Sequence, residues 1–200
     1  TAIVVLTAGR SWLPSYHFAG NYRTFAIPIR RSWRGGGRGR TGTKVREAEM
    51  ADVPRVIRFL DSVGPERQFF PRYTAADFLN GRSTFRGLDL SNLLLAYRNG
   101  ELIGTFGLWD QSTFRQTVVD RYHGLLRWMR PVYNCLATVR GFPRLPRAGC
   151  PFPFVAAALP VVRCHDEDVF ELMLRTQLSR AAVRSLWRDR YLMLGLHERD

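Results

Sequence analysis

The chain has 200 residues, of which 46% are hydrophobic and five are tryptophan. This excludes a globally disordered chain and allows one ordinary domain, or one domain with part of another. The formal net charge is +13, yet Lys44 is the only lysine, and the arginines are spread along the whole sequence. A nucleic-acid patch usually mixes lysine with arginine on one face, so we do not expect the charge by itself to indicate a nucleic-acid partner.

The three cysteines, Cys135, Cys150 and Cys164, have neither metal-like nor paired spacing. We therefore expect no metal site, and a reducing compartment with buried or incidental thiols. The longest apolar stretch, 152–162, contains two prolines and is far too short to span a membrane. These features predict a soluble, cytoplasmic protein without a membrane partner.

Residues 1–30 hold two apolar runs, 2–6 and 22–29, and the second alternates well enough to form a strand. Two strands without a helix do not make a stable domain, so we interpret 1–30 as the C-terminal strands of a preceding domain. The Arg/Gly-rich segment 31–43 is typical of a flexible linker, with RNA contact through its arginines as the alternative. Because both chain ends fall beside strand-like runs, we also expect truncation at both ends.

Residues 44–200 are predicted to form a second unit, which begins with a short strand at 44–48. Asp52 is expected to cap the helix that follows, and a Thr74/Asp77 capping box to begin a second, short helix. Runs at 93–97 and 102–108 flank Asn99-Gly100, which supplies the positive φ angles of a two-residue hairpin turn.

The second half of this unit alternates between helices and strands. Apolar spacing predicts a helix over about 117–139, a buried strand at 154–162, a long helix at 166–187 and a strand at 191–196. The apolar residues of the 117–139 helix are expected either to pack on the domain or to form an acyl groove. The expected fold class is α/β (α+β), with a mixed, mostly antiparallel sheet flanked by helices.

This order, together with the hairpin Asn99-Gly100-Glu101-Leu102-Ile103-Gly104, resembles the GCN5-related N-acetyltransferase (GNAT) superfamily. The resemblance covers 44–200, where 93–108 is similar to the second and third GNAT strands and 154–196 to the cofactor-binding strand–helix–strand unit. It implies a GNAT-like domain without its last elements, packed against a preceding GNAT-like domain in a tandem protein. It also implies an N-acyltransferase that uses acetyl-CoA or another acyl-CoA and a small-molecule amine acceptor.

The family places Gln/Arg-x-x-Gly-x-Gly/Ala between its fourth strand and the next helix, where backbone amides approach the cofactor diphosphate. Here Arg163 matches the first position, whereas Asp166 and Asp168 replace both glycines. The resemblance implies cofactor contacts at Val161, Val162 and Arg163. The acidic loop, however, favours helix capping over anion binding. A non-catalytic structural or acceptor-binding half of a tandem protein is therefore the alternative function.

Asp110 and Arg115 follow the 102–108 strand, on the acceptor side of such folds, and are the predicted substrate-binding residues. Asp110 as a turn-forming residue is the alternative. Acyl transfer to an amine needs a base and often an acid, and the sequence singles out no one residue for either role. Catalytic residues thus stay unassigned among five candidates: Glu101, His123, His165, Tyr191 and His197.

Overall fold

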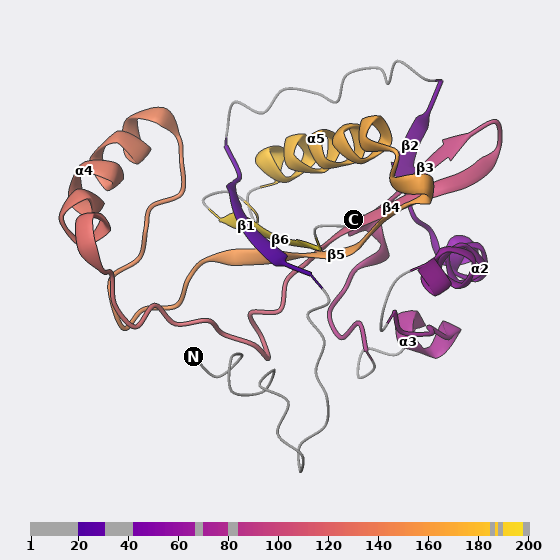
Figure 1. The fold of residues 1–200 in the computed structure, drawn as a ribbon, viewed down its shortest axis with the longest axis horizontal. Helices are drawn as coiled ribbons and strands as arrows, with labels where there is room; N and C mark the ends of the chain where they lie inside the picture. The colour runs from indigo at the N-terminus through magenta and orange to yellow at the C-terminus, as the bar shows by residue number, and fades with distance from the viewer. Residues whose placement is uncertain are drawn as a thin grey trace, which may run out of the picture. The chain divides into compact units, whose positions relative to one another are not determined.

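The computed structural model describes residues 20–30, 42–66, 70–79, 84–184, 187 and 190–197. Six strands form one sheet in the order β1-β6-β5-β4-β3-β2 (Figure 1). The strands are β1 (Tyr22–Pro28), β2 (Lys44–Glu47), β3 (Leu93–Arg98), β4 (Glu101–Trp109), β5 (Phe154–Val162) and β6 (Tyr191–His197). The helices are α2 (Val53–Val63), α3 (Ala75–Leu79), α4 (Gly124–Arg140) and α5 (Glu167–Val183).

The sheet is mixed and mostly antiparallel. β2, β3, β4 and β5 pair antiparallel in succession, whereas β5 and β6 are parallel. The predicted α+β class is therefore confirmed. The chain divides into two compact units, of which one comprises Phe25–Leu194 and the other joins residues 1–24 to 195–200. The predicted boundaries at 30 and 44 are not tested by this division, and residues 31–41 of the predicted linker at 31–43 lie outside the described residues.

The hairpin between β3 and β4 forms as predicted. Asn99 has φ 53° and Gly100 has φ 80°, so both turn residues take the left-handed conformation that a two-residue turn of this kind requires. This tight connection makes β3 and β4 neighbours, with β2 on the outer side of β3 and β5 on the outer side of β4, and both strands are almost wholly buried.

The sheet separates two apolar layers. Leu93 and Leu95 of β3 share a core cluster with Val56 and Leu60 of α2. On the α5 side, the Phe106 and Phe170 rings lie 5.8 Å apart. A Cβ atom on Gly104 would lie 3.0 Å from the Met173 sulfur, so glycine at this position lets α5 pack close against β4. Figure 1 shows α5 lying along the sheet.

The beginning of α2 differs from the prediction. Asp52 does not cap the helix with its side chain. Its carboxylate instead accepts hydrogen bonds from both terminal nitrogens of Arg46, at 2.7 and 2.6 Å, and from the Glu49 N–H at 2.9 Å. The hydrogen bonds from Arg46 lower the pKa of Asp52 to about 2. This ion pair joins β2 to the start of α2. By contrast, one half of the predicted capping box at α3 is confirmed: Asp77 accepts the Thr74 N–H at 2.8 Å, and it also accepts a hydrogen bond from the Thr74 hydroxyl.

The helix predicted over 117–139 begins later, at Gly124, and continues through Pro131 to Arg140. Residues 117–123 are not helical, and Val118 forms an isolated bridge with Pro151. The expectation that the apolar residues of this helix pack on the domain is wrong for most of them, because they are exposed. Within the described part of the chain, no helix is long and apolar enough to cross a membrane.

We expect Asp52→Asn to lower the free energy of unfolding at pH 7 by about 1–2 kcal/mol, because it breaks a partly exposed ion pair. A carboxylate with a lowered pKa stabilises the fold above its unfolded-state pKa and loses that contribution as the pH falls through the folded-state value. The difference between variant and wild type should therefore shrink between pH 4 and about 2.

Urea unfolding at a series of pH values measures this difference. Asp61→Asn removes an exposed carboxylate from the same helix and serves as the control. A difference that stays constant from pH 7 to pH 2.5 would contradict the role given to Asp52.

Candidate ligand sites at the two ends of β5

The parallel pairing of β5 with β6 covers only the beginning of β5. The described register pairs Phe154 with Tyr191, Val155 with Leu192 and Ala156 with Met193. β5 continues for six more residues, about 20 Å of strand, while it stays paired with β4 on its other side. β5 and β6 therefore separate after Ala156. β5 continues toward α5, and in this register its edge on the β6 side has no paired strand.

A β-bulge interrupts β5 in this unmatched stretch. Thr105 pairs with Val161 but Gly107 pairs with Ala158, so β5 has one residue more than β4 between these two pairs. Leu159 has φ 49°, and its carbonyl accepts a hydrogen bond from the buried Thr105 hydroxyl at 2.9 Å. Bulges of this kind are common beside active sites, where they redirect a strand.

The predicted cofactor residues Val161 and Val162 lie directly after the bulge. Both side chains are buried: Val161 belongs to the core cluster that α2 covers, and Val162 lies opposite Gly104. A ligand could therefore reach only their backbone groups. Their contact with a cofactor stays a prediction.

The loop after β5 is a strained turn that leads into α5. Cys164 and His165 have φ 54° and 50°, a left-handed conformation that is unusual for residues other than glycine. Asp166 is the N-cap of α5: its Oδ1 accepts the Val169 N–H at 3.1 Å. Its Oδ2 accepts a hydrogen bond from Arg98 Nη2 at 2.9 Å. One carboxylate thus joins the helix start to the end of β3.

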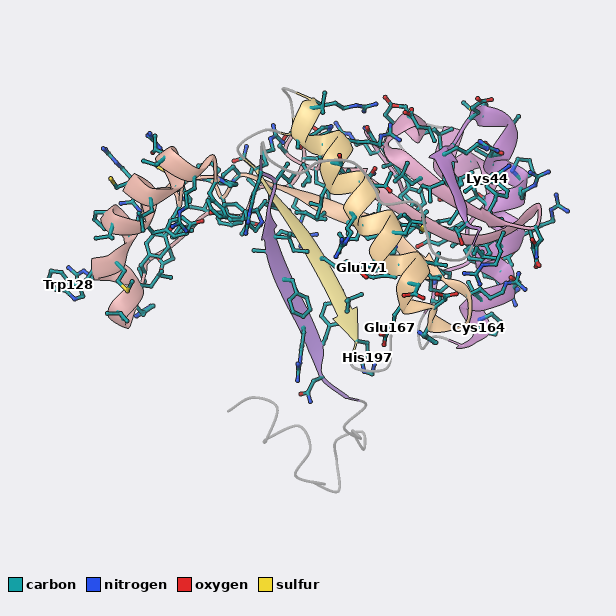
Figure 2. The ribbon with its side chains drawn as sticks, turned by 90° about the horizontal axis from the view of Figure 1, so that it is seen from above. Lys44, Trp128, Cys164, Glu167, Glu171 and His197 are labelled. Carbon is teal, nitrogen blue, oxygen red and sulfur yellow. The ribbon has the colours of Figure 1, made fainter. Side chains whose placement is uncertain are left out.

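The residues at this helix start do not fit a diphosphate. The Asp166 carboxylate already occupies the position where a bound anion would meet the first helical N–H groups. Glu167 and Asp168 add two exposed negative charges in the first turn, and Figure 2 shows Cys164 and Glu167 at this end of α5.

Arg163, the remaining predicted cofactor residue, is already in contact with protein groups. Its Nη1 lies 3.2 Å from Glu101 Oε1, and its guanidinium lies 6.0 Å from the Phe59 ring centre. Its Nε is buried and has no hydrogen-bond partner among the described residues. The Nε of Arg163 thus has an unpaired N–H among the described residues, while its Nη1 forms an ion pair with Glu101.

The predicted substrate residues Asp110 and Arg115 lie near the opposite end of β5. Asp110 Oδ2 pairs with Arg190 Nη1 at 2.8 Å, and its Oδ1 accepts the Ser112 N–H at 2.9 Å. Burial alone would raise the pKa of Asp110, but the hydrogen bonds from Ser112 and the charge of Arg190 outweigh it and hold that pKa below its usual value.

Arg115 and Arg190 line a pocket of about 180 Å³ together with aromatic and proline side chains. Asp110 is thus connected to the pocket through Arg190, which sequence reasoning did not identify. Its only sequence signal is its position directly before the predicted 191–196 strand. The remaining lining residues are Ser112, Gln116, Thr117, Pro151, Phe152, Pro153 and Phe154.

The two predicted sites are about 20 Å apart. Trp109, next to Asp110, pairs with Ala156, whereas Gly104 pairs with Val162, six residues further along β5. The structure thus places the predicted acceptor residues where β5 and β6 are paired, and the predicted cofactor residues where β5 extends beyond that pairing.

The five candidates for acid–base chemistry do not form one cluster. Tyr191 donates to the Pro143 carbonyl at 2.9 Å, its hydroxyl lies 2.9 Å from that of Tyr133, and burial raises its pKa. Glu101 pairs with Arg163, and His165 is exposed beside it. His123 is exposed at the start of α4. His197 ends β6. This distribution assigns no catalytic base.

Thiol and metal chemistry find little support. All three cysteines are exposed, so of the two alternatives, buried or incidental thiols, the buried one is wrong. Among the residues that the structure describes, no three His, Cys, Asp or Glu side chains gather closely enough to hold a metal ion.

Comparison with known proteins gives no family assignment. No protein-family model matches the chain, and no curated protein matches it at a significant level. The features of the structure that bear on function are the strand pairing around β5, the start of α5 and the pocket beside Arg190.

We expect a coupling of about 1 kcal/mol between Asp110→Asn and Arg190→Gln in a double-mutant cycle, because both partners are mostly buried. The pair Asp120–Arg121 is the matched control, since its side chains are 82% and 68% exposed and should couple by only a few tenths of a kcal/mol. Urea unfolding of the single and double variants measures both couplings. Equal coupling in the two pairs would contradict the structural role of Arg190.

Proposed function

We propose that residues 44–197 form an acyl-CoA-dependent N-acyltransferase domain of the GNAT type with a degenerate diphosphate loop. The observation that carries this proposal is the end of the parallel pairing at Ala156 and Met193, from which β5 continues toward α5. A strand edge without a neighbouring strand offers backbone N–H and C=O groups to an extended ligand. The pantetheine arm of an acyl-CoA is such a ligand, because it carries amides along its length.

The bulge at Leu159 and Pro160 supports the same interpretation. It lies between the paired start of β5 and the predicted cofactor residues Val161 and Val162. Pro160 has no N–H, so one ladder position is lost, and the strand changes direction before it reaches the loop. We propose that the backbone of Val161 and Val162, and the side chain of Arg163, contact the acyl-CoA.

The acceptor is proposed to be a small-molecule amine that binds the pocket lined by Arg115 and Arg190. The carboxylate of Asp110, held ionised by Ser112 and Arg190, lies beside this pocket and adds negative charge near it. The tandem arrangement, the packing on a preceding GNAT-like domain and a cytoplasmic location remain predictions.

One observation favours a second candidate function, a non-catalytic structural or acceptor-binding half of a tandem protein. Asp166 binds both the Val169 N–H and Arg98, so the protein's own carboxylate supplies the negative charge that a diphosphate would bring. In this case the domain keeps the shape of an acyl-CoA site without using it.

Acetyl-CoA binding separates the two candidates. We expect the wild-type chain to bind acetyl-CoA weakly, and the double variant Asp166→Gly/Asp168→Gly to bind it at least about tenfold more tightly, because two like charges next to the diphosphate are removed. Glycine at an N-cap costs the helix only a few tenths of a kcal/mol relative to aspartate. The variant also loses the ion pair with Arg98 and carries a glycine in the first turn, which together cost about 1–2 kcal/mol, and circular dichroism shows whether the fold is kept. Isothermal titration calorimetry measures affinity and stoichiometry together.

Glu171→Gln is the control, because it removes one negative charge from α5 about one turn further along the helix. An equal gain in this variant would attribute the effect to general charge. Binding by the glycine variant alone would support the non-catalytic candidate. If neither the wild type nor the glycine variant binds acetyl-CoA, the GNAT proposal fails.

A further inference from the structure

α4 presents an apolar stripe to solvent. Leu125 is 72% exposed, Trp128 76% and Val139 82%, and four further apolar residues of the helix are about half exposed: Leu126, Met129, Val132 and Leu136. At 100° per residue all of these side chains except Leu126 fall within an arc of about 100°, so these six form one continuous face. A contiguous exposed apolar surface on a helix commonly marks an interaction site.

The opposite face of α4 is held by the chain itself. Asn134 accepts the Leu145 N–H at 2.8 Å and donates to the Leu145 carbonyl at 3.0 Å. Arg130 Nε donates to the Pro146 carbonyl at 2.8 Å, and Ala137 is 2% exposed. These contacts fix the rotation of the helix, and the apolar stripe therefore points away from the segment that α4 packs against. Figure 2 shows Trp128 projecting outward from α4.

The surroundings of the stripe are strongly basic. Residues 121–150 contain six arginines and no aspartate or glutamate. Arg127 lies directly beside the stripe, with its guanidinium 5.7 Å from the Trp128 ring centre, and Arg140 ends the helix. An occupant of this surface must accept apolar side chains at its centre and must carry negative charge at its rim.

We infer that α4 docks on an anionic lipid surface and lies in the membrane interface. Interfacial helices combine leucine and tryptophan on one face with arginine on the other, and anionic headgroups attract the arginines. A second copy of the chain fits less well, because pairing two stripes would bring twelve arginines together, and the carboxylate next to this segment, Asp120, is already paired with Arg121 of its own copy. The proposal does not depend on acyltransferase function.

This inference revises the prediction that no membrane takes part. That prediction was based on the lack of a stretch long enough to span a bilayer. A helix of 17 residues that lies in the surface does not need to span it. The revision comes from the exposure of the stripe, which apolar spacing in the sequence does not reveal.

Vesicle flotation tests the proposal with the full chain and two compositions, pure phosphatidylcholine and a mixture with phosphatidylglycerol. We expect binding to the anionic vesicles and at least about tenfold weaker binding to the neutral ones. Leu125→Ser/Val139→Ser should weaken anionic-vesicle binding about tenfold or more, because the apolar contact is lost. Arg127→Gln should weaken it about fivefold.

Val183→Ser is the matched control, because Val183 is 78% exposed on α5, outside the stripe. Its binding should equal that of the wild type. Trp128→Phe should keep vesicle binding but remove part of the tryptophan quenching by brominated lipids, which locates the stripe within the bilayer.

Three outcomes would overturn the proposal: no binding to anionic vesicles, equal binding of the stripe variant and the wild type, or sedimentation of the free chain as a dimer that the stripe variant abolishes. The last result would assign the stripe to a second copy. Circular dichroism of each variant shows whether the fold is kept, and a folded variant makes every outcome decisive.

Discussion

The hydrogen bonds of the Asp166 carboxylate determine whether an anionic ligand can bind at the start of α5. One oxygen caps α5 and the other accepts from Arg98, so this carboxylate both starts the helix and fastens it to β3. A helix start offers only a few N–H donors and one concentration of positive potential. Whatever occupies that position excludes a second anion, and here the occupant is part of the chain.

The surrounding architecture would otherwise suit an extended cofactor. β5 leaves the register with β6 after Ala156, passes a bulge at Leu159 and ends in a left-handed turn at Cys164 and His165. Glycine is the residue that normally allows such a turn. Here Cys164 and His165 take the left-handed conformation, which strains the backbone, and the acidic residues 166–168 follow them directly. The strand geometry thus favours binding, and the loop chemistry opposes it. This conflict is why weak binding and a non-catalytic role are the two candidate functions.

Much of the fold could be predicted because its signals are local. The Asn99-Gly100 turn, the apolar run of β5 and the spacing of Val169, Met173 and Leu178 on α5 each depend on neighbouring residues, and all three are confirmed. The contacts that shape the candidate sites are not local. Arg190 pairs with Asp110, which is 80 residues away in the sequence, and Arg98 pairs with Asp166, which is 68 residues away. No local pattern in a single sequence predicts such pairs.

Spacing also fails to tell which way an amphipathic helix faces. The apolar residues of α4 have helical periodicity, and the sequence predicts that they either pack on the domain or form an acyl groove, yet Trp128 and Val139 face solvent. Asn134 and Arg130 hold the other face through backbone carbonyls at Leu145 and Pro146, and such contacts leave no apolar signature. The prediction for Asp52 is wrong for a similar reason. Asp52 has the sequence position of a helix cap, but its side chain binds Arg46, and the local sequence pattern does not reveal that contact.

The most direct test is a crystal structure of the wild-type chain with coenzyme A at saturating concentration. The expected result is that the Asp166 carboxylate keeps its bonds to Val169 and Arg98, with any bound ligand lying along β5 beyond Ala156 and its diphosphate away from the start of α5. A diphosphate bound to the first N–H groups of α5, with Asp166 displaced, would contradict it.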